Sequence, residues 1–380
     1  MIKKTRRLAS IWWSQWRSRS EHCASPSQNT TTLEEDNPKT KQLRTSTMKR
    51  DAYFDNARFL LILLVVFGHL ISPLKSDNDL LYGLYKFIYL FHMPAFILIS
   101  GYFSKGFDKP GYLKKTFTKT LIPYAIFQII YCFFYYFTGY DKDFSFSLFD
   151  PHWTLWFLIS LFCWNVLLKL FAKKSWALPV AFAIGIAAGY IPFFGSYLSI
   201  ERTLIFFPFF LIGYLMHSEH FHLLRSIKGK LIALPVLVAV FIGCNTLIPD
   251  SFNDWLLGSS SYADMGYKDW SAGLLRTMFY GLNLIMTFSF LAIIPKKHYF
   301  FTVYGARTLY IYLLHGFFIK LVGLTDSYND IHEIYQYVML LIGAAALCRF
   351  LGSDVVKNLA KPLIELKPPA FFQSRKTSTN

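Results

Sequence analysis

The feature that most constrains this chain is a series of long apolar runs that begins at residue 57 and recurs to residue 351. An α-helix needs ~20 apolar residues to cross ~30 Å of hydrocarbon. Helices are expected because backbone that faces lipid must satisfy its hydrogen bonds within its own segment. The runs cover residues 57–74, 80–103, 120–139, 153–171, 175–194, 203–217, 230–249, 273–294, 300–323 and 333–351. We therefore expect an all-α integral membrane protein with about ten transmembrane helices.

The composition favours the same class. Apolar residues make up 54% of the chain and charged residues only 16%, whereas soluble domains carry about 25% charged residues. The net charge of +16 could indicate a nucleic-acid partner. It could equally come from basic cytoplasmic loops, which are usual in membrane proteins. The positions of the charges between the runs distinguish these two explanations.

The loops between the runs alternate strictly in charge. One set is basic and contains Lys105, Lys109, Lys114, Lys115, Lys119, Lys173, Lys174, Arg225, Lys228, Lys230, Lys296 and Lys297. The other set is acidic and contains Asp77, Asp79, Asp141, Asp143, Asp150, Glu201, Asp250, Asp254, Asp264, Asp269, Asp326 and Asp330. By the positive-inside rule the basic loops and both termini are cytoplasmic. The topology thus accounts for the basic excess, and we expect no nucleic-acid partner.

Three regions are predicted along the chain. Residues 1–50 form a basic, polar extension that is expected to be disordered. Residues 51–352 form the membrane domain, and residues 353–380 form a basic cytoplasmic tail. Two interpretations of the extension stay open. In one, Trp12, Trp13 and Trp16 share the face of a short interfacial helix; in the other, Met48 is the native start.

The first apolar run contains two ionisable residues, Arg58 and His69, in "DNARFLLILLVVFGHL". Their separation of eleven residues is three helical turns plus roughly 20°, so both project from one helix face about 16 Å apart along the axis. Arg58 then lies at the cytoplasmic edge, where Asp55 is close enough to pair with it. His69 lies too deep to reach the headgroups, and polar residues at such depth usually face a cavity or a partner.

This pairing suits two kinds of chemistry. A neutral imidazole can accept the proton of a hydroxyl near pH 7, which makes His69 a candidate general base. The planar guanidinium of Arg58 suits a phosphate. A phosphate-bearing cytoplasmic donor and a hydroxyl acceptor would fit, and so would proton-coupled transport. The spacing of the two residues does not decide between them.

The chain resembles the membrane-bound acyltransferase 3 family, within it the fucose 4-O-acetylase-like branch. Arg58 and His69 match the Arg-x(10)-His motif of its first span. Four further segments occur in the order expected for the family: "YLFHMPAFILISGYFSKG" (89–106), "LWFLISLFCW" (155–164), "FFPFFLIGYLM" (206–216) and "YGARTLYIYLLHGFFI" (304–319). The likeness covers about residues 50–350.

The resemblance implies transfer of an acyl group, typically acetyl from acetyl-CoA, to a hydroxyl of a sugar or surface glycan. It implies a donor that binds on the cytoplasmic side, with many acceptors outside. In the family the histidine is the candidate base and the arginine is essential, and we carry these roles to His69 and Arg58. No permanently bound cofactor and no metal site are predicted.

Other candidate residues are less strongly indicated. Many members carry an Arg-x-x-Arg motif after the second span, where this chain has Lys114, Lys115 and Lys119. These lysines could contact CoA phosphates or could be ordinary positive-inside residues. Arg307, expected one to two turns inside the ninth span, could join them. As acceptor-side candidates we name His92, His315 and Arg202. A helix-packing hydrogen bond for His92 and an interfacial ion pair with Glu201 for Arg202 are the structural alternatives.

The sequence thus predicts a multi-pass O-acyltransferase of the cell membrane, expected to be a bacterial plasma membrane. Its partners would be acyl-CoA, a sugar or glycan acceptor and the lipid bilayer. A polytopic transporter or exporter of a glycan or small molecule is the alternative. No inverted repeat is apparent in the sequence, although such repeats can be weak.

Overall fold

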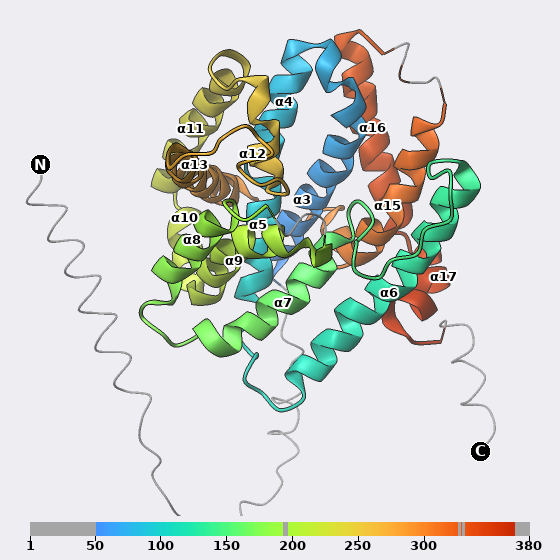
Figure 1. The fold of residues 1–380 in the computed structure, drawn as a ribbon, viewed down its shortest axis with the longest axis horizontal. Coiled ribbons are helices and arrows are strands. Elements are labelled where there is room, and N and C mark those ends of the chain that lie inside the picture. The colour runs from blue at the N-terminus through green and yellow to red at the C-terminus, as the bar shows by residue number, and fades with distance from the viewer. Residues whose placement is uncertain (1–50, 193–196, 326–327, 329–330, 369–380) are drawn as a thin grey trace, which may run out of the picture. The chain divides into compact units, whose positions relative to one another are not determined.

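A computed structural model describes residues 51–192, 197–325, 328 and 331–368, and within these ranges it contains helices and connecting turns but no strand (Figure 1). The expectations for residues 1–50 lie outside the described residues. The helices, in chain order, are α3 (Ala52–Ile71), α4 (Asp79–Tyr89), α5 (His92–Tyr102), α6 (Tyr112–Thr138), α7 (Trp156–Phe171), α8 (Ala177–Ala188), α9 (Ile200–Leu215), α10 (Ser218–Leu224), α11 (Ile227–Thr246), α12 (Asn253–Leu257), α13 (Ser271–Ile293), α14 (Thr302–Gly305), α15 (Thr308–Gly323), α16 (Ile334–Leu351) and α17 (Asp354–Glu365). Short 3₁₀ turns lie at Ser72–Asp77, Tyr197–Ser199 and Asp250–Phe252.

Each expected apolar run overlaps a helix of the structure. Seven segments among the described residues are long and apolar enough to cross a membrane, namely Ala52–Lys75, Asp79–Tyr102, Tyr112–Thr138, Tyr197–Leu215, Ile227–Thr246, Ser271–Ile293 and Ile334–Leu351. The remaining three runs correspond to the shorter apolar helices α7, α8 and α15. The prediction of a helical multi-pass membrane protein is therefore confirmed, whereas the count of ten crossings stays a prediction.

Two of the expected runs are interrupted. The run at 80–103 breaks between α4, which ends at Tyr89, and α5, which begins at His92. Pro94 explains the break, because it lacks the N–H that would bond to the carbonyl of Leu90 in a continuous helix. The run at 300–323 divides into α14 and α15. Arg307 is the N-cap of α15, whereas we expected it one to two turns inside a continuous helix.

Helix α3 contacts α4, α5, α14, α15 and α16, and in Figure 1 it lies among α4, α5, α15 and α16. Its start is fixed by side chains that satisfy backbone groups. The Asp51 carboxylate accepts the Tyr53 N–H at 2.9 Å and caps the helix. The buried Asn56 amide donates to the carbonyls of Pro295 and Lys297, both at 2.9 Å, and accepts from the Thr302 hydroxyl at 2.6 Å. The segment that carries Arg58 is thus tied to the chain between α13 and α14.

Helices α5 and α9 cross at very close range through two glycines. A Cβ at Gly101 would lie 1.9 Å from the Phe210 carbonyl oxygen, and a Cβ at Gly213 would lie 1.8 Å from that of Leu98. Membrane helices pack mainly by van der Waals contact, and small residues let their backbones approach closely. Because the obstacles are backbone oxygens, a larger residue at either position would force the helices apart.

We predict that Gly213→Ala destabilises the protein by about 1–3 kcal/mol, the usual cost of overpacking. Thermal unfolding in detergent measures the effect. Gly281→Ala is the matched control, because Gly281 lies in α13 and nothing occupies the space within 4 Å of its added Cβ. Equal melting temperatures for the two variants would contradict the close α5–α9 crossing.

Candidate functional site

A cavity of about 350 Å³ lies between α3, α5, α6, α7 and α15. This volume falls at the lower end of the ~300–1,000 Å³ typical of small-molecule sites. The lining residues are Arg58, Ile62, Val65, His69, Met93, Phe96, Ser100, Phe103, Ser104, Tyr112, Thr116, Lys119, Thr120, Thr154, Trp156, Phe157, Leu158, Leu161, Asn165, Thr308, Leu309 and Tyr312. The lining includes two basic side chains, a histidine and no carboxylate among the residues that the structure describes.

The contribution of α3 to the cavity is one helix face. Arg58, Ile62, Val65 and His69 recur at steps of four, three and four residues, which is the period of a single face. Arg58 and His69 therefore open into the same cavity, as their spacing predicted. We call its two ends the Arg58 end and the His69 end.

At the Arg58 end the guanidinium is held in place by two neighbours. Asp55 lies 3.4 Å from it in an ion pair, as predicted, and the Phe103 ring lies 4.3 Å away beneath it. Lys119 also lines the cavity, whereas Lys114 and Lys115 are exposed on α6 outside the lining. Of the three expected lysines, only Lys119 is thus brought to the cavity.

Hydroxyl groups line the wall between α5 and α6. Ser100, Ser104, Thr116 and Thr120 each donate their hydroxyl hydrogen to the carbonyl four residues earlier, at 2.8–3.0 Å. A hydroxyl that donates in this way keeps its oxygen lone pairs as acceptors. This wall therefore offers hydrogen-bond acceptors to a ligand that carries N–H groups.

At the His69 end three aromatic side chains surround the imidazole. The Tyr89 hydroxyl lies 3.3 Å from His69 Nδ1. The ring centroids of Trp153 and His315 lie 4.5 Å and 5.6 Å from that of His69, the His315 ring being stacked on it. The structure therefore brings His315, predicted from a distant segment of the chain, directly to His69.

The hydrogen bonds of His315 indicate its tautomer. Its Nδ1 lies 2.7 Å from the Tyr312 carbonyl and 3.1 Å from that of Ile311. A carbonyl can only accept, so Nδ1 carries the hydrogen. Nε2 is then a lone-pair acceptor, and it is buried with no hydrogen-bond partner within the described part of the chain. His315 does not itself line the cavity, although its ring stacks on His69, which does.

His92 and Arg202 lie near the site without lining the cavity. His92 Nδ1 lies 2.9 Å from the Ile88 carbonyl, and its ring packs against Tyr89, which agrees with a role in holding the break between α4 and α5. The Arg202 guanidinium lies 5.1 Å from the centroid of Trp156, a cavity residue. The described contacts contain no ion pair between Arg202 and Glu201.

Arg307 is engaged elsewhere. Its guanidinium pairs with Asp354 at 2.7 Å and donates to the Gly352 carbonyl at 2.7 Å. It lines a separate hollow beside α16 and α17, although the next residue, Thr308, lines the main cavity. The expectation that Arg307 joins a phosphate cluster at the cavity is therefore not supported by its position.

Trp153 is a site residue that the sequence analysis did not identify. The sequence did not indicate a site role for Trp153, because a tryptophan at a predicted membrane edge is ordinarily explained by the aromatic belt. Its backbone has φ 38°, a left-handed conformation that costs a non-glycine residue of order 1–3 kcal/mol. The buried Gln128 holds the preceding loop: its amide donates to the carbonyls of Ser147 and Asp150, and its oxygen accepts the His152 N–H.

The chain is similar to known proteins over much of its length. The profile of the acyltransferase 3 family, described as an acyltransferase domain, matches residues 51–352. The nodulation protein NolL of Sinorhizobium fredii is 33% identical over 189 residues, covering 44% of this chain and 48% of that protein. The nodulation protein NolL of Mesorhizobium japonicum is 31% identical over the same length and the same shares of the two chains. No solved structure matches the chain.

The chain spans about half the length of the curated relatives that it matches. The family profile, in contrast, covers all the residues that line the cavity, from Arg58 to Tyr312. The resemblance expected from the motif set is thereby confirmed at the level of the family. This helical membrane protein belongs to the acyltransferase 3 family.

Proposed function

We propose that this protein is an O-acyltransferase that moves an acetyl or other short acyl group from acyl-CoA to a hydroxyl of a sugar or surface glycan. The observation that carries the proposal is a single cavity with a permanently charged guanidinium at one end and an imidazole at the other. The family, whose profile describes an acyltransferase domain, supports the same reaction class. The donor, the acceptor and the roles of individual residues are part of the proposal.

The proposed topology has ten crossings with both termini in the cytoplasm, so that the Arg58 end faces the cytoplasm. The alternation of basic and acidic loops supports this orientation. Helices α7, α8 and α15, with 16, 12 and 16 residues, are shorter than ~30 Å of hydrocarbon requires. They would cross together with the turns that flank them. A bacterial plasma membrane is the proposed location, in keeping with the bacterial origin of the two relatives.

The donor would enter at the Arg58 end. Arg58 suits a CoA phosphate as a bidentate partner, and Lys119 adds a second positive charge at the cavity. Lys114 and Lys115, exposed on the same helix as Lys119, could meet phosphates that remain outside the cavity. The amide N–H groups of the pantetheine arm would find the hydroxyl acceptors of Ser100, Ser104, Thr116 and Thr120.

The acceptor would enter from the His69 end. His69 takes the proton of the acceptor hydroxyl while the hydroxyl oxygen attacks the thioester carbonyl. The carbon–sulfur bond then breaks, and the proton passes from His69 to the departing sulfur, so the products are the ester and free CoA. The lone pair of His315 Nε2 would orient a sugar hydroxyl, with Arg202 and His92 as outer contacts. Attack by His69 itself, through an acyl-histidine, is the less favoured variant.

The role of His69 predicts that His69→Ala lowers acetyl transfer by at least 10²-fold, the usual contribution of a positioned general base. The assay uses the purified full chain, labelled acetyl-CoA and a glycan acceptor. His332→Ala is the control, because His332 is exposed and lies outside the cavity lining. Turnover like that of the wild type in His69→Ala would remove the proposed mechanism. A transporter, the alternative function, would bind no labelled acetyl-CoA at all.

The role of Arg58 predicts a defect that depends on the donor's phosphates. Arg58→Gln should raise KM for acetyl-CoA by about tenfold or more, since a hydrogen bond to a charged group contributes about 1.5–3 kcal/mol. The same substitution should leave KM unchanged for S-acetylpantetheine, which has no phosphate. Arg307→Gln, at a residue engaged with Asp354, serves as the control. An equal rise in KM for both donors would show that Arg58 does not bind the phosphates.

A further inference from the structure

One face of α4 carries a row of tyrosines that leads to His69. Tyr82, Tyr85 and Tyr89 follow one another at steps of three and four residues, so they share that face. Tyr85 and Tyr89 are buried, and their rings stack with centroids 3.9 Å apart. The last member of the row places its hydroxyl 3.3 Å from His69 Nδ1.

The close approach of Tyr89 depends on the residue before His69. A Cβ at Gly68 would lie 3.0 Å from the Tyr89 ring, tighter than ordinary contact. The absence of a side chain at this position lets the ring lie against α3. Behind Tyr89, the Tyr85 ring is stacked on the Tyr89 ring, so the two side chains lie against each other. The imidazole thus has a hydroxyl partner, and a second tyrosine packs directly against that partner.

The direction of these hydrogen bonds decides whether His69 can act as a base. If the Tyr89 hydroxyl donates to Nδ1, the neutral imidazole carries its hydrogen on Nε2 and has no free lone pair. If Nδ1–H donates to the Tyr89 oxygen, Nε2 keeps a lone pair for a substrate hydroxyl. The second arrangement requires another acceptor for the Tyr89 hydrogen, and the hydroxyl oxygen of the neighbouring Tyr85, whose ring stacks on Tyr89, has the chemistry for that role.

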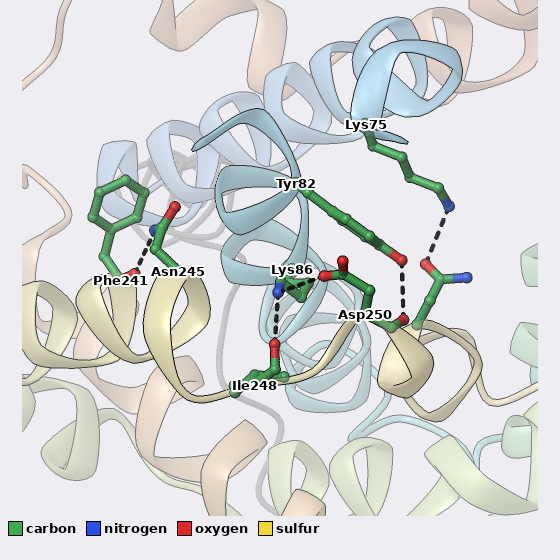
Figure 2. A network of polar contacts seen from close by, with 8 residues as sticks. Lys75, Tyr82, Lys86, Phe241, Asn245, Ile248 and Asp250 are labelled. Carbon is green, nitrogen blue, oxygen red and sulfur yellow. Dashed lines mark hydrogen bonds and ion pairs between the residues drawn. The ribbon is translucent and has the colours of Figure 1, made fainter. Parts of the chain in front are cut away.

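A second set of contacts holds α4 against the turn that follows α11. Figure 2 shows Lys86 and Tyr82 reaching from α4 to the turn after α11. The buried Lys86 ammonium donates to the Ile248 carbonyl at 2.7 Å and pairs with Asp250 at 3.0 Å. The Tyr82 hydroxyl donates to the Asp250 carbonyl at 3.0 Å. These contacts fix the register of α4, and with it the position of the tyrosine row.

We propose that Tyr89 and Tyr85 are positioning residues that hold His69 in the tautomer with its hydrogen on Nδ1, so that Nε2 is free to accept the proton of the acceptor. In this arrangement the Nδ1–H of His69 donates a hydrogen bond to the Tyr89 oxygen, and the Tyr89 O–H donates to the Tyr85 oxygen. Neither tyrosine touches the reacting atoms. The inference rests on the proposed function, because it assigns a partner to the base of that reaction.

The test compares three variants of the full chain: Tyr89→Phe, Tyr85→Phe and the double variant. Each single change should lower kcat about tenfold and leave KM for both substrates unchanged, which is the size expected for losing one hydrogen bond. In Tyr85→Phe the Tyr89 O–H has lost its acceptor, so it donates to Nδ1 of His69. The imidazole then carries its hydrogen on Nε2 and cannot act as the base. The double variant should therefore fall about tenfold in total, because removing the Tyr89 hydroxyl also removes that wrong donor.

Tyr280→Phe is the matched control: its hydroxyl is equally buried and donates to the Ile205 carbonyl at 2.8 Å, outside the cavity lining. Its kcat should equal that of the wild type. Phenylalanine keeps each ring, and melting temperatures establish that every variant is folded.

Two results would overturn the proposal. One is a kcat for Tyr89→Phe within about twofold of the wild type. The other is single losses that multiply to about a hundredfold in the double variant, as independent packing defects would. In either case an inactive His69→Ala would leave the acyltransferase proposal intact, whereas an active one would remove both.

Discussion

Hydrocarbon offers no hydrogen bonds, so a polar side chain inside a bilayer must find its partners within the protein or at a water-filled cavity. This constraint governs α3. Arg58 meets Asp55 and the Phe103 ring, and His69 meets the Tyr89 hydroxyl, while both open into one cavity. Helices α5, α6, α7 and α15 supply the other walls of this cavity.

The walls depend on backbone features that bring helices unusually close or interrupt them. Gly101 and Gly213 let α5 and α9 cross at a distance that a methyl group would prevent. The break before Pro94 divides an expected span into α4, whose tyrosines reach His69, and α5, whose serines line the wall near Arg58. A continuous helix could not present both sets of residues at these positions. The break between α4 and α5 thus contributes Tyr89 to the His69 end of the cavity and Ser100 to its wall near Arg58.

The sequence predicted the parts of the site that depend on local periodicity. The face shared by Arg58 and His69 and the pairing with Asp55 follow from helix geometry, and both are present. The contact between His69 and His315 joins distant segments, so helix periodicity could not predict it, and the family segment indicated His315 only as a candidate residue. Trp153 and its anchor Gln128 had no signal, because a loop conformation fixed by one buried amide has no periodicity. The division of the run at 300–323 into α14 and α15, with Arg307 at the N-cap of α15, could not be read from its hydropathy.

The central claim is that the thioester of the donor lies in the cavity between Arg58 and His69. The most direct measurement is a structure of the full chain with an acetyl-CoA analogue in which a methylene group replaces the thioester sulfur. The account predicts nucleotide phosphates in contact with Arg58, a pantetheine arm along Ser100 and Thr116, and the acyl carbonyl beside His69. An analogue bound outside this cavity, or one that contacts neither Arg58 nor His69, would contradict the account.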